Sequence, residues 1–201
     1  MDAGLAALLG AAVGALGTGG AAAVTGLLGR GQARTQLRAE HVRLLREPRR
    51  SAYVAFAQCF QEVHALHSEA ARSAASAAVT GTEAEAGTAA GTAGPDRDRL
   101  LTLAEEAYAR AGERLHGELQ SRKSAVTVEG PPALTAAAFE AEGALLVSRG
   151  EVYRWIRTLR QGTATADHER AAEDALLAVH HPFVTFLNAA SAALADDGLG
   201  P

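Results

Sequence analysis

The chain has 201 residues, of which 48% are hydrophobic but only 4% aromatic, and its formal net charge is −4 at pH 7. Abundant alanine and few strand-favouring residues indicate a helical body of ordinary domain size. Residues 51–201 carry twelve basic and twenty acidic side chains, which argues against nucleic acid as a partner, and the single cysteine, Cys59, excludes an internal disulfide.

The first segment, residues 3–29, contains no charged side chain. At about 1.5 Å of rise per residue, a helix of this length spans roughly 40 Å, enough to cross a bilayer. We therefore predict a transmembrane anchor over residues 1–30. Two alternatives stay open. One is a signal peptide cleaved near Ala21-Ala22-Ala23, although Asp2 gives its start the wrong charge. The other is a soluble tail rich in Gly and Ala.

Small residues recur at every fourth position of this segment, and Gly10 and Gly14 form a G-x-x-x-G pair. In membranes such pairs let two helix backbones approach closely. The two glycines are therefore candidates for self-association into a homodimer. Because small residues fill most of the segment, the same spacing also arises readily by chance.

A basic collar follows, because residues 30–50 contain seven arginines and two glutamates. Cations beside an apolar span favour the cytoplasmic side, and each is attracted to anionic lipid headgroups by roughly 1 kcal/mol. We expect a basic juxtamembrane helix over 31–50 in a single-pass protein of the cell membrane, with the N-terminus outside and the C-terminal body cytoplasmic. The arginines expected at the headgroups are Arg30, Arg34, Arg38, Arg43 and Arg46.

The body, residues 51–201, contains four segments in which apolar side chains alternate spacings of three and four, as in helices that pack in coiled-coil fashion. The four predicted helices run from about 49 to 76, from Asp96 to about 122, from 132 to about 161, and from Thr165 or Asp167 onwards with a kink or break at Pro182. We interpret 77–95 as a flexible linker and 124–129 as an extended connector.

The predicted fold class is therefore all-α: an N-terminal transmembrane helix followed by an antiparallel four-helix bundle with long helices. The larger apolar side chains should form its core, each contributing roughly 1.5–3 kcal/mol on burial. These are Phe56, Leu66, Leu101, Leu115, Leu145, Trp155, Phe183 and Phe186.

Histidines provide the only hints of metal chemistry. His64 and His67 lie one turn apart, and His180 and His181 precede Pro182. The two pairs would bind zinc if they met across the bundle, but nothing in their spacing brings them together.

No pattern for catalysis or cofactor binding stands out either. Glu113 and His116 form one E-x-x-H, whereas di-metal bundles use two copies. Cys59, on the apolar seam, is expected to be a buried structural thiol. We therefore expect no catalytic residue, no cofactor and no metal site.

Three stretches of sequence carry a resemblance: GQARTQLRAEHVRLLREPRRSAYVAF (31–56), VEGPPAL (128–134) and FLNAASAAL (186–194). The chain resembles a group of uncharacterised small actinobacterial proteins with an apolar N-terminus, an Arg-rich collar and a helical body. Ala52, Tyr53 and Phe56 match the A-Y-x-x-F helix start of that group, whereas Pro132 stands where a charged residue is more usual. The resemblance implies a membrane anchor and a helical body, and it implies no activity.

These features favour a membrane-anchored helical scaffold or protein-interaction module, whose partner is a second copy or another membrane protein. The alternative is a membrane-anchored bundle that senses a small ligand in a pocket between helices, where Pro48 and Pro182 distort the packing near Tyr53 or Trp155. An enzyme is less favoured, because the seam positions are almost all apolar or small.

Overall fold

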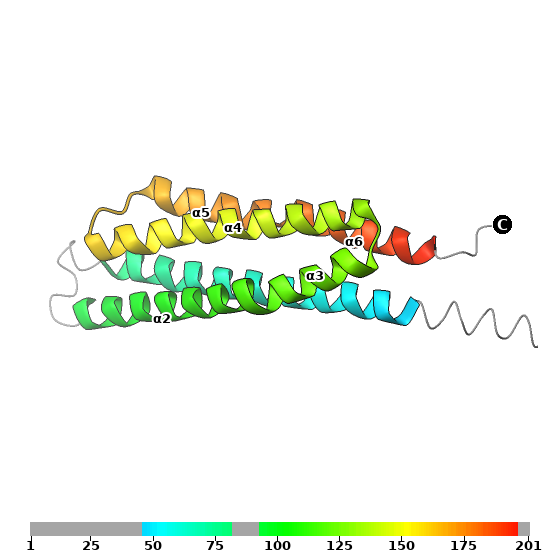
Figure 1. Cartoon of the computed structure of the whole chain (residues 1–201). Helices are drawn as coiled ribbons and strands as arrows, with labels where there is room; N and C mark the ends of the chain where they lie inside the picture. The colour runs from blue at the N-terminus through cyan, green and yellow to red at the C-terminus, as the bar shows by residue number, and fades with distance from the viewer. Residues whose placement is uncertain (1–45, 82–92, 197–201) are drawn as a thin grey trace, which may run out of the picture. The chain divides into compact units, whose positions relative to one another are not determined.

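The computed structural model describes residues 46–81 and 93–196, which form helices and no strand (Figure 1). Within these ranges there are four long helical segments: a helix over residues 46–81; α2 (Ala93–Arg114), which continues through the π-helical η1 (Leu115–Leu119) into α3 (Gln120–Glu129); α4 (Pro132–Gln161); and α5 (Ala166–Ala178) followed by α6 (His180–Ala195). Successive segments run in opposite directions in Figure 1. The predicted all-α bundle is confirmed for the described residues.

The predicted N-terminal elements lie largely outside this description. The anchor over 1–30, the glycines Gly10 and Gly14, and the collar up to residue 45 are not among the described residues. Within the described part of the chain, no helix has both the length and the apolar character needed to cross a membrane.

The connections between the helices follow local sequence signals. α4 ends where Gly162 adopts a left-handed conformation (φ 68°, ψ 21°), a conformation that glycine adopts without steric cost. α5 begins after Thr165, whose backbone N–H donates to His168 Nδ1 at 3.2 Å. The kink or break predicted at Pro182 lies three residues earlier, at Val179, because Pro182 has no N–H to donate to the carbonyl of Ala178.

Two predicted irregular segments are instead helical. Residues 124–129 belong to α3, because Val126 is fully buried and the hydroxyls of Ser124 and Thr127 donate to the carbonyls four residues earlier. Tertiary packing here outweighs the strand propensity of the β-branched side chains. Residues 77–81 and 93–95 of the predicted linker are also helical, since Ala77 is fully buried among other alanines, and residues 82–92 lie outside the described ranges.

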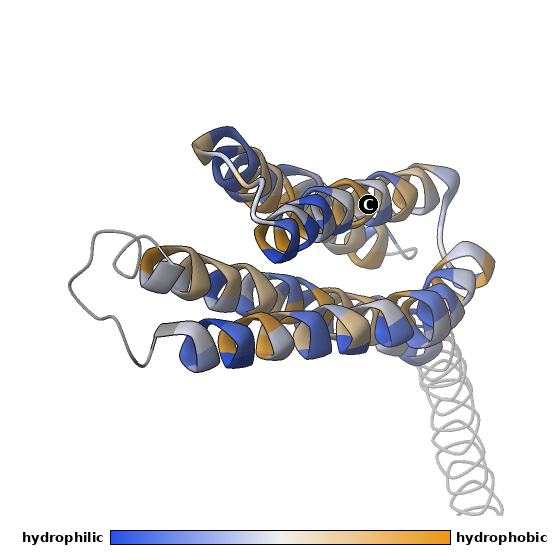
Figure 2. Cartoon of the chain, turned by 90° about the vertical axis from the view of Figure 1, so that its left-hand side faces the viewer, coloured by the Kyte–Doolittle hydropathy of each residue, from blue (hydrophilic) through white to orange (hydrophobic). Residues whose placement is uncertain are grey.

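The core consists of two packed regions. In the first, the rings of Phe60 and Phe183 stack with centroids 4.5 Å apart, and those of Phe56 and Phe186 lie 4.6 Å apart. The second region is centred on Trp155 and the alanine-rich faces of neighbouring helices. Figure 2 shows hydrophobic and hydrophilic residues alternating along each helix, as amphipathic packing requires.

All but one of the predicted core side chains are buried. The exception is Leu66, which is only half-buried, whereas its neighbour His67 is fully buried. At this turn the inward position is therefore one residue later than predicted, whereas Phe56, Cys59 and Val63 of the predicted seam are buried.

Candidate functional site

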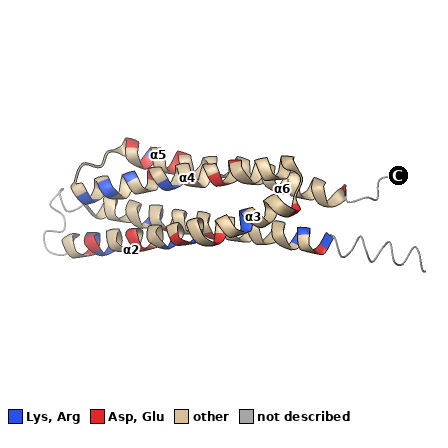
Figure 3. Cartoon of the chain, in the orientation of Figure 1, with Lys and Arg blue, Asp and Glu red and all other residues tan. Residues whose placement is uncertain are grey.

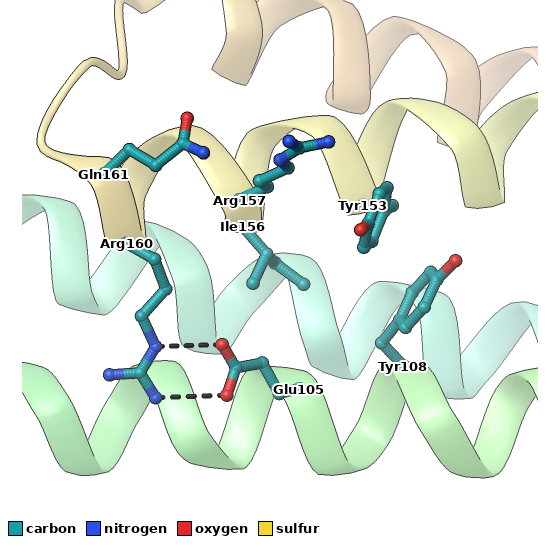
Figure 4. Close-up of a pocket in the computed structure, with 7 residues that line it drawn as sticks. All are labelled: Glu105, Tyr108, Tyr153, Ile156, Arg157, Arg160 and Gln161. Atoms are coloured by element: carbon teal, nitrogen blue, oxygen red, sulfur yellow. Dashed lines mark hydrogen bonds and ion pairs between the residues drawn. The ribbon is translucent and has the colours of Figure 1, made fainter.

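A surface groove of about 290 Å³ lies between α2 and α4 (Figure 4). Aromatic and apolar side chains line its middle, where the rings of Tyr108 and Tyr153 stack with centroids 5.4 Å apart and Ile156 lies beside them. The remaining lining residues are Glu105, Arg157, Arg160 and Gln161. The groove thus combines flat apolar surfaces with guanidinium and amide donors.

An ion pair closes one end of the groove. Arg160 donates from Nε to Glu105 Oε1 at 2.8 Å and from one terminal nitrogen to Oε2 at 3.1 Å (Figure 4). Further donations reach Asp98 at 3.2 Å and Thr102 at 3.0 Å. The hydrogen bond to Glu105 raises the pKa of Arg160, which stays cationic. Because the pair is solvent-exposed, it fixes the position of Arg160 more than it stabilises the fold.

A third guanidinium, that of Arg149, lies over the ring of Tyr108. Arg149 Cζ lies 5.0 Å from the Tyr108 ring centroid, within cation–π range, and Arg149 also bonds His116 Nε2 at 3.0 Å. Burial raises the pKa of the Tyr108 phenol, so this hydroxyl keeps its proton at neutral pH. Chemically, the groove is suited to hold a planar or aromatic group near a cation.

The histidine pairs of the sequence analysis do not assemble as a ligand set. His67 is buried against Ser148, with Nδ1 and Oγ 3.1 Å apart, while His180 and His181 are exposed. His64 lies close enough to His180 for that charge to lower its pKa, after the larger effect of burial. Among the described residues, no three His, Cys, Asp or Glu side chains are grouped to hold a metal ion.

The hydrogen bonds of Ser148 define the protonation of His67. The Ser148 hydroxyl donates to Leu145 O at 2.9 Å, so its oxygen accepts from the Nδ1–H of His67. This bond places a hydrogen on Nδ1, and because the buried Nε2 has no partner among the described residues, the ring is neutral near pH 7. Burial, and then the charges of His64 and Arg149, lower the pKa of His67 from 6.5 to about 4.

Other residues singled out from the sequence lie outside any reactive cluster. Glu113 and His116 are both exposed, and His116 contacts Arg149 rather than a carboxylate. Cys59 is buried, as predicted, and burial together with Glu118 and Glu62 raises its pKa to about 11. Its thiol is therefore protonated at neutral pH and is a poor nucleophile.

The two positions proposed for a sensor pocket are filled. Tyr53 is buried and its hydroxyl donates to Glu129 O at 3.3 Å, and Trp155 is buried in the second core region. The groove lies beside Trp155 in sequence, on the outer side of α4, where Tyr153 and Arg157 line it. Its aromatic pair could have been suspected from the sequence, because Tyr153 lies seven residues after Leu146 and fourteen after Phe139, on a second apolar stripe of the same helix.

Comparisons with protein-family models, with curated proteins and with solved structures find no match for this chain. What the groove and the outer surfaces bind is therefore inferred from their own residues.

Proposed function

We propose that the protein is a membrane-anchored helical scaffold that acts by binding other proteins. The observation that carries the proposal is the burial of the large apolar side chains in the bundle core, where Phe56, Leu115 and Trp155 are each at most 2% exposed. The described polar and aromatic features that remain accessible lie on the outer surface. A chain with this arrangement offers surfaces for contact rather than an enclosed reaction site.

The membrane part of the proposal rests on the sequence. The uncharged segment 3–29 is the anchor, and Arg30, Arg34, Arg38, Arg43 and Arg46 bind anionic headgroups on the cytoplasmic side. The resemblance to small actinobacterial membrane proteins points the same way. The bundle then lies in the cytoplasm beside the membrane, where its partner is a second copy or another membrane protein.

Membrane fractionation tests the anchor. We expect the full chain to stay with membranes after a carbonate wash, and a chain shortened to start at Glu47 to be released. Leu16→Arg places a charge in the middle of the segment and should release the full chain, because a central arginine costs about 2.5–3.5 kcal/mol in a spanning helix. Release of the unaltered full chain by carbonate would refute the anchor.

Labelling of an added cysteine tests the orientation. Ser121 is exposed, and the native Cys59 is buried, so Ser121→Cys supplies one accessible thiol. We expect a membrane-impermeant maleimide to label this variant only after the cells are permeabilised. Labelling of intact cells would place the bundle outside and contradict the proposed topology.

The groove between α2 and α4 supports a second candidate, a small-ligand sensor. Its stacked tyrosines would hold an aromatic ring and Arg157 would bind a carboxylate. Thermal unfolding of the chain starting at Glu47 with benzoate and indole-3-carboxylate tests this, with Tyr153→Ala removing half of the aromatic pair. Leu177→Ala, at an exposed position on α5, is the matched control. Stabilisation that Tyr153→Ala abolishes would favour the sensor over the scaffold.

A further inference from the structure

The exposed face of α4 carries large apolar side chains that the bundle covers only in part. Phe139, Leu146, Val147 and Tyr153 are all exposed, with Val147 61% exposed. We call these four residues the α4 stripe. Phe139, Leu146 and Tyr153 are separated by seven residues each, so they lie on one side of the helix two turns apart. Lys123 Nζ lies 4.3 Å from the ring centroid of Phe139, which packs against the bundle on that side.

Two glycines lie between the members of the α4 stripe. Gly143 and Gly150 are in the middle of a long helix, where glycine is among the poorest helix formers. A Cβ atom added at either position would meet no other heavy atom within 4 Å, so contacts among the described residues do not require them. They leave space on the helix surface into which the side chains of another helix fit.

The exposed charges of α4 are opposite at its two ends. Glu140 lies in the N-terminal half, and Arg154 and Arg157 lie in the C-terminal half. Figure 3 shows basic residues (blue) gathered along the C-terminal part of α4. Such a helix complements a copy of itself that runs the other way, whereas a parallel copy would place like charges side by side.

We propose that the α4 stripe is a dimer interface that binds α4 of a second copy in antiparallel orientation, with the two-fold axis at Val147. Glu140 and Arg154 each lie seven residues from Val147, on opposite sides of it, so each carboxylate faces the guanidinium of the other copy. Phe139 comes opposite the surface between Tyr153 and Arg157, at the edge of the groove. The interface is isologous and closes as a dimer.

The first experiment measures the mass of the full chain in detergent by sedimentation. We expect a dimer at high micromolar concentration, and we expect Val147→Arg to shift it to monomer by placing two arginines together at the axis. Leu177→Arg is the matched control, because Leu177 is exposed on α5 and should leave the dimer intact. Circular dichroism of both variants reports whether the bundle stays folded. A folded Val147→Arg protein that dimerises like the unaltered chain would overturn the proposal.

Charge reversal tests the pairing directly. In the unaltered chain Arg154 pairs with Glu151 on its own helix, an exposed contact that a partner's carboxylate can share. Glu140→Arg alone and Arg154→Glu alone should each weaken the dimer at low salt, and the double variant should restore it, because its facing charges are again opposite. No restoration in the double variant would contradict the register.

Disulfide trapping tests the orientation. In the Val147→Cys variant the cysteines of the two chains would lie next to each other at the axis and should crosslink on mild oxidation. In the Glu140→Cys variant the two cysteines would lie about 21 Å apart along the helices, beyond the reach of a disulfide. Crosslinking through Glu140→Cys, whether or not Val147→Cys also crosslinks, would indicate a parallel pair and refute the proposal. The unaltered chain is the control, because Cys59 is buried.

This dimer does not depend on the membrane anchor. A chain that is released by carbonate and still crosslinks through Val147→Cys would refute the anchor and support the interface. A membrane-bound dimer that survives Val147→Arg would refute the interface and leave the anchor standing, with Gly10 and Gly14 as the remaining candidates for self-association.

Discussion

Acid should destabilise the bundle chiefly through His67. Its ring is fully buried between the helix over residues 46–81 and α4, and it faces Ser148, Arg149 and His64. Burial lowers its pKa from 6.5 to about 4. Between these two values the unfolded chain binds a proton that the folded chain does not bind. The free energy of unfolding therefore falls as the pH falls through this range.

The magnitude follows from the difference between the two pKa values. A fall in pKa from 6.5 to about 4 corresponds to a loss of about 3 kcal/mol between neutral pH and pH ~4. His64 acts in the same direction, since burial lowers its pKa too. For a domain whose whole stability is about 5–15 kcal/mol, this is a substantial share.

Urea unfolding followed by far-UV circular dichroism measures this loss on a chain starting at Glu47, which contains the compact helical unit. His67→Leu removes the titrating ring and leaves Ser148 bonded to Leu145 O, so no buried donor loses its partner. We expect this variant to lose about 3 kcal/mol less than the unaltered chain between pH ~7 and ~4. His181→Gln, at an exposed histidine, is the control and should behave as the unaltered chain does.

The reasoning is wrong if the unaltered chain and His67→Leu lose equal stability over this pH range. Equal losses would mean that the ring of His67 gains its proton as readily in the folded chain as in the unfolded one. That would require water or a carboxylate at Nε2, where the described residues provide no partner.

Three further outcomes test the packing and the helix ends. Trp155→Ala should cost about 3–5 kcal/mol in urea unfolding, because the indole is almost fully buried, and a loss below about 1 kcal/mol would contradict that burial. Gly162→Ala should lower the free energy of unfolding by about 1 kcal/mol or more, because Gly162 has a left-handed backbone conformation at the end of α4. Gly143→Ala, inside the same helix, should raise the free energy of unfolding by up to about 1 kcal/mol. Equal effects of the two substitutions would refute the conformational reasoning. Cys59 should resist thiol reagents near neutral pH until the chain unfolds, and fast labelling of the folded chain would contradict its burial.

The helix boundaries that were predicted correctly rest on local chemistry. Gly162 ends a helix because glycine adopts the left-handed conformation there without steric cost. Pro182 interrupts the last helix because it lacks a donor, although the interruption lies at Val179 and not after His181. These signals act within one turn, so a single sequence contains them. The linker boundaries and the helical state of residues 124–129 depend instead on packing against residues that are distant in the sequence. Ala77 and Val126 are helical because they pack against other helices.

The groove between α2 and α4 could not be located from the sequence for a related reason. The stacking of Tyr108 on Tyr153 and the pairing of Glu105 with Arg160 depend on how far α2 is rotated and shifted against α4. Heptad periodicity indicates which side of a helix faces inward, but it does not fix the register between two helices. The apolar residues on the exposed side of α4 are visible in the sequence. Alanine is so common along the chain, however, that a second apolar stripe on one helix does not stand out.

At Leu66 and His67 the apolar pattern predicted the wrong residue to be buried. Hydrophobicity favours Leu66 as the buried residue, but burial of the next position places Phe60, Val63 and His67 on one inward stripe. A buried imidazole is tolerated because Ser148, 81 residues away on α4, accepts a hydrogen bond from its Nδ1–H. No pattern within the first helix contains that information. The acid response predicted for the bundle therefore depends on His67, a side chain that the apolar pattern alone would place on the surface.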